Sequence, residues 1–302
     1  MMSFFIAFVL GSVLIGAGAM LAPAWSGDDN HVGLSTGVIL SIIVVGAMAQ
    51  TRLLGWDTLV IDYIIFGVVS AVILGGTLAG NAQADTEVSD DEDTDIFALT
   101  ITYERIFFLC VFAGFALLLI FGWQEIPVAQ PISIDQLNLS NTPIIDLISL
   151  YLSAQMRQEI LLVQPAVTLT MSFVAVMVAY DVGRVWGNQT IGQIFSAVSL
   201  LINLYFMLTG NHFALTNLLC GLTIMGFLRF MQVAYSWQAV ILSGVVLGSA
   251  IYASNLLFGL GLGLLGILAI VRYREISQMQ ILSTLGIAGI AILCASPVLF
   301  SA

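Results

Sequence analysis

Apolar residues run in long unbroken stretches along most of the chain instead of alternating with polar ones. A helix needs about 20 apolar residues to cross a bilayer core of about 30 Å. Backbone polar groups inside a bilayer must be satisfied internally, and continuous apolar runs favour helices over strands. We therefore predict an all-α fold, a polytopic transmembrane helix bundle of nine or ten helices. The predicted spans are 3–24, 33–50, 58–79, 101–122, 160–180, 189–209, 211–230, 236–252, 255–271 and 278–299.

Polar sequence interrupts this pattern in two places and divides the chain into three parts. Residues 1–80 hold three predicted helices, 81–99 form an acidic linker, and 100–302 hold the remaining helices. Seven of the eighteen acidic residues lie between Asp85 and Asp95. Because like charges repel and nothing apolar is available to bury, we expect the linker to be solvated.

The second polar segment is the loop 123–159, which is the most informative part of the sequence. It leads into an amphipathic stretch, 144–162, and a helix there would lie in the plane of the membrane interface. Loops of this length are often functional, and this loop is where a polar site can be assembled beside the membrane. The apolar face of the stretch is formed by Ile145, Ile148, Leu152 and Met156, opposite Gln155 and Gln158.

Composition supports lipid as the main solvent of the chain. Sixty per cent of the residues are hydrophobic, 8% are charged, and the mean hydropathy is +1.06. A soluble domain carries about 25% charged residues, so we predict a multi-pass protein of the cell membrane with the bilayer as its partner. The seven basic residues are all Arg and form no basic patch, which argues against a nucleic-acid partner.

The positions of the arginines predict an orientation, because cytoplasmic loops collect positive charge. The favoured arrangement places five of the seven arginines inside and leaves Arg52 and Arg157 outside. The loop 123–159 and the short turn 209–212 then lie on the outer face.

Few ionisable residues fall at membrane depth, where they are candidates for function. Asp62 lies near the start of the third predicted span, either as an ion or proton site or at headgroup level beside Tyr63. Asp181 and Arg184 are spaced to pair locally as interfacial anchors. His212 lies in the predicted outer turn, with either a chemical role or only the polarity that such a turn requires.

Sequence motifs of soluble enzymes and metal sites are absent. The chain contains no Ser-His-Asp or Cys-His arrangement, no phosphate-binding Gly-rich loop and no HExxH motif. The two histidines are far apart and form no ligand motif. All three cysteines lie in apolar spans, where they are expected to act as small buried hydrophobes.

The order of features from residue 100 onward resembles a known family. Asp135 follows the fourth predicted span, and an amphipathic segment then leads to a helix start at Gln164-Pro165. Next come YDVGRVWG at 180–187, LTNLLCGLTIMGFLRF at 215–230 and WQAVILSGVVLGSAIYAS at 237–254. This order resembles the membrane core of the GT-C glycosyltransferases, the polyprenyl-phosphate-sugar-dependent family that includes the protein O-mannosyltransferases.

The resemblance implies a site at the outer membrane face. Asp135 occupies the position of the catalytic acid of the family, which takes a proton from the acceptor hydroxyl or helps to hold a divalent metal. Arg157, Asn211 and His212 would bind the polyprenyl-phosphate-linked sugar. The second acid of the family's pair is replaced by Gln136, so a non-catalytic relative also fits the resemblance.

Two other classes of function fit the same sequence. Scarce buried charge and many helix faces of small residues are typical of a non-enzymatic subunit that packs against membrane protein partners in a larger complex. A transporter, in which Asp62 would be the key residue, is a further alternative, although no internal repeat is evident.

Overall fold

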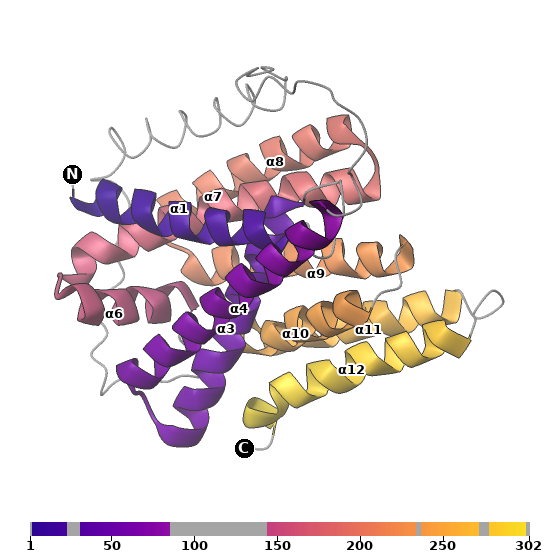
Figure 1. The fold of residues 1–302 in the computed structure, drawn as a ribbon. Coiled ribbons are helices and arrows are strands. Elements are labelled where there is room, and N and C mark those ends of the chain that lie inside the picture. Colours follow the sequence, from indigo (N-terminus) through magenta and orange to yellow (C-terminus); the bar gives the residue numbers. More distant parts are fainter. Residues whose placement is uncertain (1, 23–30, 85–143, 234–236, 272–277, 300–302) are drawn as a thin grey trace.

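The computed structural model describes residues 2–22, 31–84, 144–233, 237–271 and 278–299, and these residues form an all-α bundle (Figure 1). Most of the predicted acidic linker, the predicted fourth span and Asp135 lie outside the described residues. The described helices are α1 (Met2–Leu21), α3 (Val32–Leu54), α4 (Thr58–Ala84), α6 (Ile144–Met156), α7 (Ile160–Trp186), α8 (Gln189–Leu208), α9 (His212–Val233), α10 (Trp237–Ala253), α11 (Asn255–Val271) and α12 (Gln278–Leu299).

Each described span that the apolar stretches predicted is helical, and the predicted all-α class is confirmed. The boundaries differ most at α7, which continues past residue 180 to Trp186. The amphipathic stretch 144–162 forms α6 but is broken after Met156, and α7 begins at Ile160. The first half of α6 is buried in the bundle. It is therefore packed against other helices and does not simply lie on a surface.

The bundle has apolar side chains outside and many polar ones inside. Phe66, Leu256 and Leu293 each expose more than 70% of their area, whereas Asn203 exposes none. A protein in water arranges these groups in the opposite way, so this distribution fits a hydrocarbon environment. By length and composition, α3, α7, α8 and the segment Ile281–Leu299 of α12 are long and apolar enough to cross a membrane.

Helix α8 shows this distribution of apolar side chains outside and small or polar ones inside on its two faces. Large apolar side chains, among them Leu201 and Tyr205, are exposed on one face. The opposite face is buried and carries small or polar residues, because these let helix backbones approach closely within a bilayer. The buried residues are Gly192, Ser196, Ser199, Asn203 and Met207.

Helix α7 is the centre of the bundle, and its side chains from Val163 to Ser172 are all buried. Helices α1, α3, α6, α8 and α9 all pack against it. Helix α10 joins α9 and α3 to α12, and α10, α11 and α12 lie together as the orange and yellow layer of Figure 1. The N-terminal helices α1 and α3 therefore share one hydrophobic core with the later helices.

The contact between α3 and α7 is especially close at Gly33. A Cβ atom added there would lie 2.5 Å from the backbone carbonyl of Met177. Because the obstacle is backbone, a rotamer change cannot relieve the clash. We predict that Gly33→Ala destabilises the folded protein by about 1–3 kcal/mol through overpacking. The measurement is thermal unfolding in detergent.

The control for this prediction is Gly16→Ala in α1. An added Cβ at Gly16 meets nothing within 4 Å. Alanine also favours a helix interior over glycine by roughly 0.5–1 kcal/mol, so this variant should be as stable as the parent or more so. Equal losses in both variants would contradict the proposed close approach of α3 and α7.

Candidate functional site

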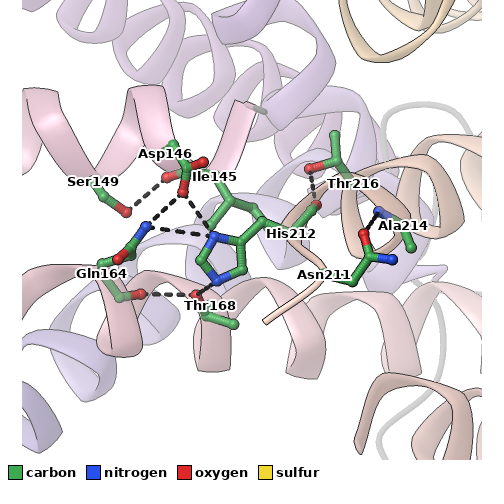
Figure 2. Close-up of polar contacts among 9 residues, drawn as sticks. All are labelled: Ile145, Asp146, Ser149, Gln164, Thr168, Asn211, His212, Ala214 and Thr216. Atoms are coloured by element: carbon green, nitrogen blue, oxygen red, sulfur yellow. Dashed lines mark hydrogen bonds and ion pairs between the residues drawn. The ribbon is translucent and has the colours of Figure 1, made fainter. Parts of the chain in front are cut away.

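A buried carboxylate–imidazole pair ties α6 to α9. Asp146 lies in the first turn of α6, and its Oδ1 is 2.7 Å from Nδ1 of His212, the first residue of α9. Their side chains are only 6% and 4% exposed. In Figure 2 the two side chains point toward each other across the space between their helices.

Two side chains of α7 complete this cluster (Figure 2). Nε2 of Gln164 donates to Oδ1 of Asp146 at 2.6 Å. The hydroxyl of Thr168 donates to the backbone carbonyl of Gln164 at 2.9 Å, so it can only accept from Nε2 of His212, at 3.4 Å. Both ring nitrogens of His212 therefore have a polar partner, Asp146 at Nδ1 and Thr168 at Nε2.

The surrounding helices suit a negative charge at Asp146. The first turn of a helix carries partial positive charge from its free N–H groups, and this stabilises a nearby carboxylate. Asp146 is in the first turn of α6, and its partner His212 begins α9. The cluster thus fastens three helices, α6, α7 and α9, at one point.

The other histidine of the chain also faces an aspartate. Nδ1 of His31 is 3.7 Å from Oδ1 of Asp181, and the backbone N–H of Leu34 donates to Oδ2 at 3.0 Å. The sequence suggested that Asp181 pairs with Arg184 on its own helix, but the carboxylate is buried and turns to the start of α3 instead. Arg184 lies over the Tyr180 ring, 5.8 Å from its centroid.

The face of α6 turned away from His212 lines an apolar cavity of about 260 Å³. The cavity is enclosed by α1, α3, α4, α6 and the middle of α7. Its lining is almost wholly apolar: Leu10, Val13, Leu14, Ala17, Ile39, Leu40, Ile43, Val44, Ala47, Met48, Thr51, Trp56, Ile61, Ile65, Val69, Ile144, Leu147, Ile148, Tyr151, Leu152 and Met171.

The cavity is elongated along α3. Its lining follows α3 from Ile39 to Thr51, which is about 18 Å at a rise of about 1.5 Å per residue. A second cavity of about 40 Å³ lies on the other side of Met171, between α3, α6, α9 and α10. Met171 lines both cavities.

One end of the large cavity has a polar rim. Tyr151 lines the cavity, and its hydroxyl donates to Oδ1 of Asp62 on α4. Nε2 of Gln155, one turn further along α6, donates to Oδ2 of the same carboxylate at 2.7 Å. Partial burial raises the pKa of the Tyr151 hydroxyl above its ordinary value, and Asp62 raises it further, so this hydroxyl stays protonated as a donor. We call Asp62, Tyr151 and Gln155 the rim cluster.

Arg157 ends α6 just beyond the rim cluster. Its φ of 51° is in the left-handed region, and the N–H of Gln158 donates to the carbonyl of Ser153 at 3.1 Å. This is the bond that closes a helix with a left-handed residue, a position where glycine is preferred. The Arg157 side chain is exposed.

The structure separates the predicted substrate-binding residues. His212 is buried in the cluster with Asp146, whereas Asn211 is exposed and accepts a hydrogen bond from the N–H of Ala214 at 3.0 Å, capping α9. Arg157 lies beyond the opposite end of α6, about 16 Å along the helix axis from Asp146 at about 1.5 Å per residue. Asp135 lies outside the described residues.

Sequence reasoning did not assign Asp146, Gln164 or Thr168 to a site. Asp146 and His212 are 66 residues apart, and only the packing of α6 between α7 and α9 brings them together. The signal that was available is the position of Asp146 on the buried side of an otherwise apolar helix start.

Comparisons with known proteins leave the family open. No family model, no curated protein and no solved structure matches this chain. Within the described helices and turns, no three His, Cys, Asp or Glu side chains come together in a group that could hold a metal ion.

The buried pair predicts a strong effect for Asp146→Ala. Removing the carboxylate leaves Nδ1 of His212 and Nε2 of Gln164 buried without their acceptor. We expect a loss of about 3–5 kcal/mol, the cost typical of removing one member of a buried ion pair. Unfolding in detergent measures this loss, and adding His212→Ala should cost less than the sum of the single changes.

Ser149→Ala is the matched control on the same helix. The Ser149 hydroxyl is fully buried but donates to the carbonyl of Ile145 in its own helix, at 2.7 Å. Its loss should cost about 1 kcal/mol or less. If Asp146→Ala were no more harmful than this control, the pair would not be what holds α6 in place.

Proposed function

We propose that the chain is an integral membrane protein that binds a lipid-linked sugar, with the lipid chain in the large apolar cavity and the head group at its polar rim. The observation that carries this proposal is the cavity itself. It combines a volume of about 260 Å³ with an almost wholly apolar lining, and a long hydrocarbon chain is the ligand that such a lining suits.

The free energy of burying apolar groups favours a chain-like ligand in the large cavity. Each methylene removed from water contributes about 0.8 kcal/mol, and an enclosed apolar wall adds close van der Waals contact. An elongated groove of about 18 Å fits a linear alkyl or isoprenoid chain better than a compact solute. The exposed apolar surface of the bundle is consistent with lipids as the surrounding molecules from which such a ligand would come.

The resemblance to the GT-C family suggests the chemical identity of the head group. It implies a polyprenyl-phosphate-linked sugar as substrate, Asp135 as the acid, and Arg157 as a cation for the lipid phosphate. Arg157 follows directly on the helix that carries the rim cluster. The buried position of His212 favours a supporting role, in which it holds α6, over contact with the substrate.

Filling the cavity should abolish lipid binding. Ala47 lines the cavity from α3, and Ala47→Trp would place an indole in the volume assigned to the lipid chain. We expect at least a tenfold loss of affinity for polyprenyl phosphate, about 1.4 kcal/mol or more. Native mass spectrometry of the purified protein with added lipid gives the measurement.

Leu264→Trp on α11 serves as the control for general effects of a large side chain. Leu264 is exposed and does not line the cavity, so lipid binding should be retained. Unchanged binding in Ala47→Trp, with the protein still folded, would remove the cavity as the lipid site.

Two substitutions test the transferase chemistry separately from lipid binding. Asp135→Asn should abolish glycosyl transfer in membranes, because the amide cannot act as a base. Arg157→Gly removes the guanidinium while relieving a left-handed arginine, so it should fold at least as well as the parent. We expect it to weaken binding of the phosphorylated lipid.

Transfer that is unaffected by Asp135→Asn would remove the proposed acid. Lipid binding without any transfer in the parent protein would favour the non-catalytic relative.

A further inference from the structure

We propose that the rim cluster of Asp62, Tyr151 and Gln155 binds hydroxyl groups of the sugar, and so distinguishes a glycosylated lipid from the bare lipid. This inference rests on the proposed function, because it assumes that a lipid chain occupies the large cavity. The sequence allowed Asp62 to be an ion or proton site or to lie at headgroup level beside Tyr63, and in the structure it bonds Tyr151 and Gln155 of α6.

The geometry connects the cluster to the cavity through Tyr151. The ring of this residue lines the cavity, while its hydroxyl bonds Asp62 at the edge. Ile61, the residue before Asp62, also lines the cavity. A molecule whose chain fills the apolar lining would therefore have its polar end beside Asp62 and Gln155, both of which are exposed.

Among the described residues that line or border the cavity, this is the only polar end of this kind. Ala17, Ile39 and Val72 pack together in a small apolar cluster at the opposite end of the stretch of α3 that lines it. The chain direction of α3 and α4 brings Ile61 near Thr51, away from that cluster. The head group is thus expected at the Thr51 and Tyr151 end, and the chain terminus at the Ile39 end.

The chemistry of the cluster favours hydroxyl donors. A carboxylate offers about four acceptor positions, and Tyr151 and Gln155 each occupy one. The remaining acceptors can take hydrogen bonds from vicinal hydroxyls, which are stronger than neutral ones because the acceptor is charged. A phosphate at the same point would meet a like charge, so the phosphate of the proposed ligand must lie short of Asp62, between the hydrocarbon chain and the sugar that reaches the carboxylate. No ion pair of Asp62 is present among the described residues.

The Asp62 carboxylate is pre-organised for binding. The two donors hold the Asp62 carboxylate from two different positions on α6, so its orientation is fixed before a ligand arrives. A fixed acceptor loses less conformational freedom on binding than a free side chain. The contact also joins α4 to α6 across the mouth of the cavity.

The test compares two lipids that differ only in the sugar. Full-length protein in a sugar-free detergent is incubated with decaprenyl phosphate or with decaprenyl-phosphate glucose, and the bound fraction is measured by native mass spectrometry. In Asp62→Asn we expect affinity for the glycosylated lipid to fall about tenfold, because hydrogen bonds to a charged acceptor are lost. Affinity for the bare lipid should stay unchanged.

Two further variants make the result specific. Asp57→Asn changes another exposed aspartate close by on the chain, whose Oδ1 accepts from the N–H of Leu59 at 2.9 Å, and it should bind both lipids like the parent. Tyr151→Phe keeps the ring on the cavity wall but removes the donor that orients Asp62. It should weaken binding of the glycosylated lipid alone.

The outcomes separate this inference from the proposed function. Equal loss for both lipids in Asp62→Asn, or loss for neither, would overturn sugar recognition by the rim cluster while leaving the lipid cavity intact. Failure of the unsubstituted protein to bind either lipid would overturn the proposed function and this inference with it.

Discussion

The hydrogen bond between Asp146 and His212 is the interaction on which the rest of the arrangement depends. Helix α6 has only 13 residues and is too short to be held by apolar packing along a full span. The Asp146 carboxylate ties it to α7 and α9 together, in addition to the packing of its buried apolar residues. Because the opposite face of α6 forms a wall of the large cavity, this contact also helps to set the shape of the cavity.

Most other buried polar groups play a more local role. Hydroxyls such as those of Ser41, Ser172 and Thr223 donate to carbonyls one turn earlier in their own helices. This satisfies them in an apolar surrounding without selecting a neighbour. The choice of which helices meet therefore rests on close backbone approach, as at Gly33, and on aspartates that bond across helices, namely Asp62, Asp146 and Asp181.

The sequence allowed the helical class and most helix positions to be predicted, because continuous apolar runs have one stable solution in lipid. It also located α6 from the spacing of Ile145, Ile148 and Leu152. The partners of Asp62, Asp146 and Asp181 could not be predicted, since each pairing depends on how distant helices pack. The i, i+3 spacing predicted that Asp181 pairs with Arg184. In the structure Asp181 instead faces His31, 150 residues away in the sequence.

Met171 lies between the large and the small cavity, together with Leu40, Val44, Ile144 and Ile148, which also line both. Methionine is unbranched and has three rotatable bonds, so it changes shape at little cost compared with a leucine or valine in the same place. A change of its rotamer shifts free volume from one compartment to the other without moving a helix. The partition between the two cavities is adjustable, and the volume of each is consequently not fixed by the backbone alone.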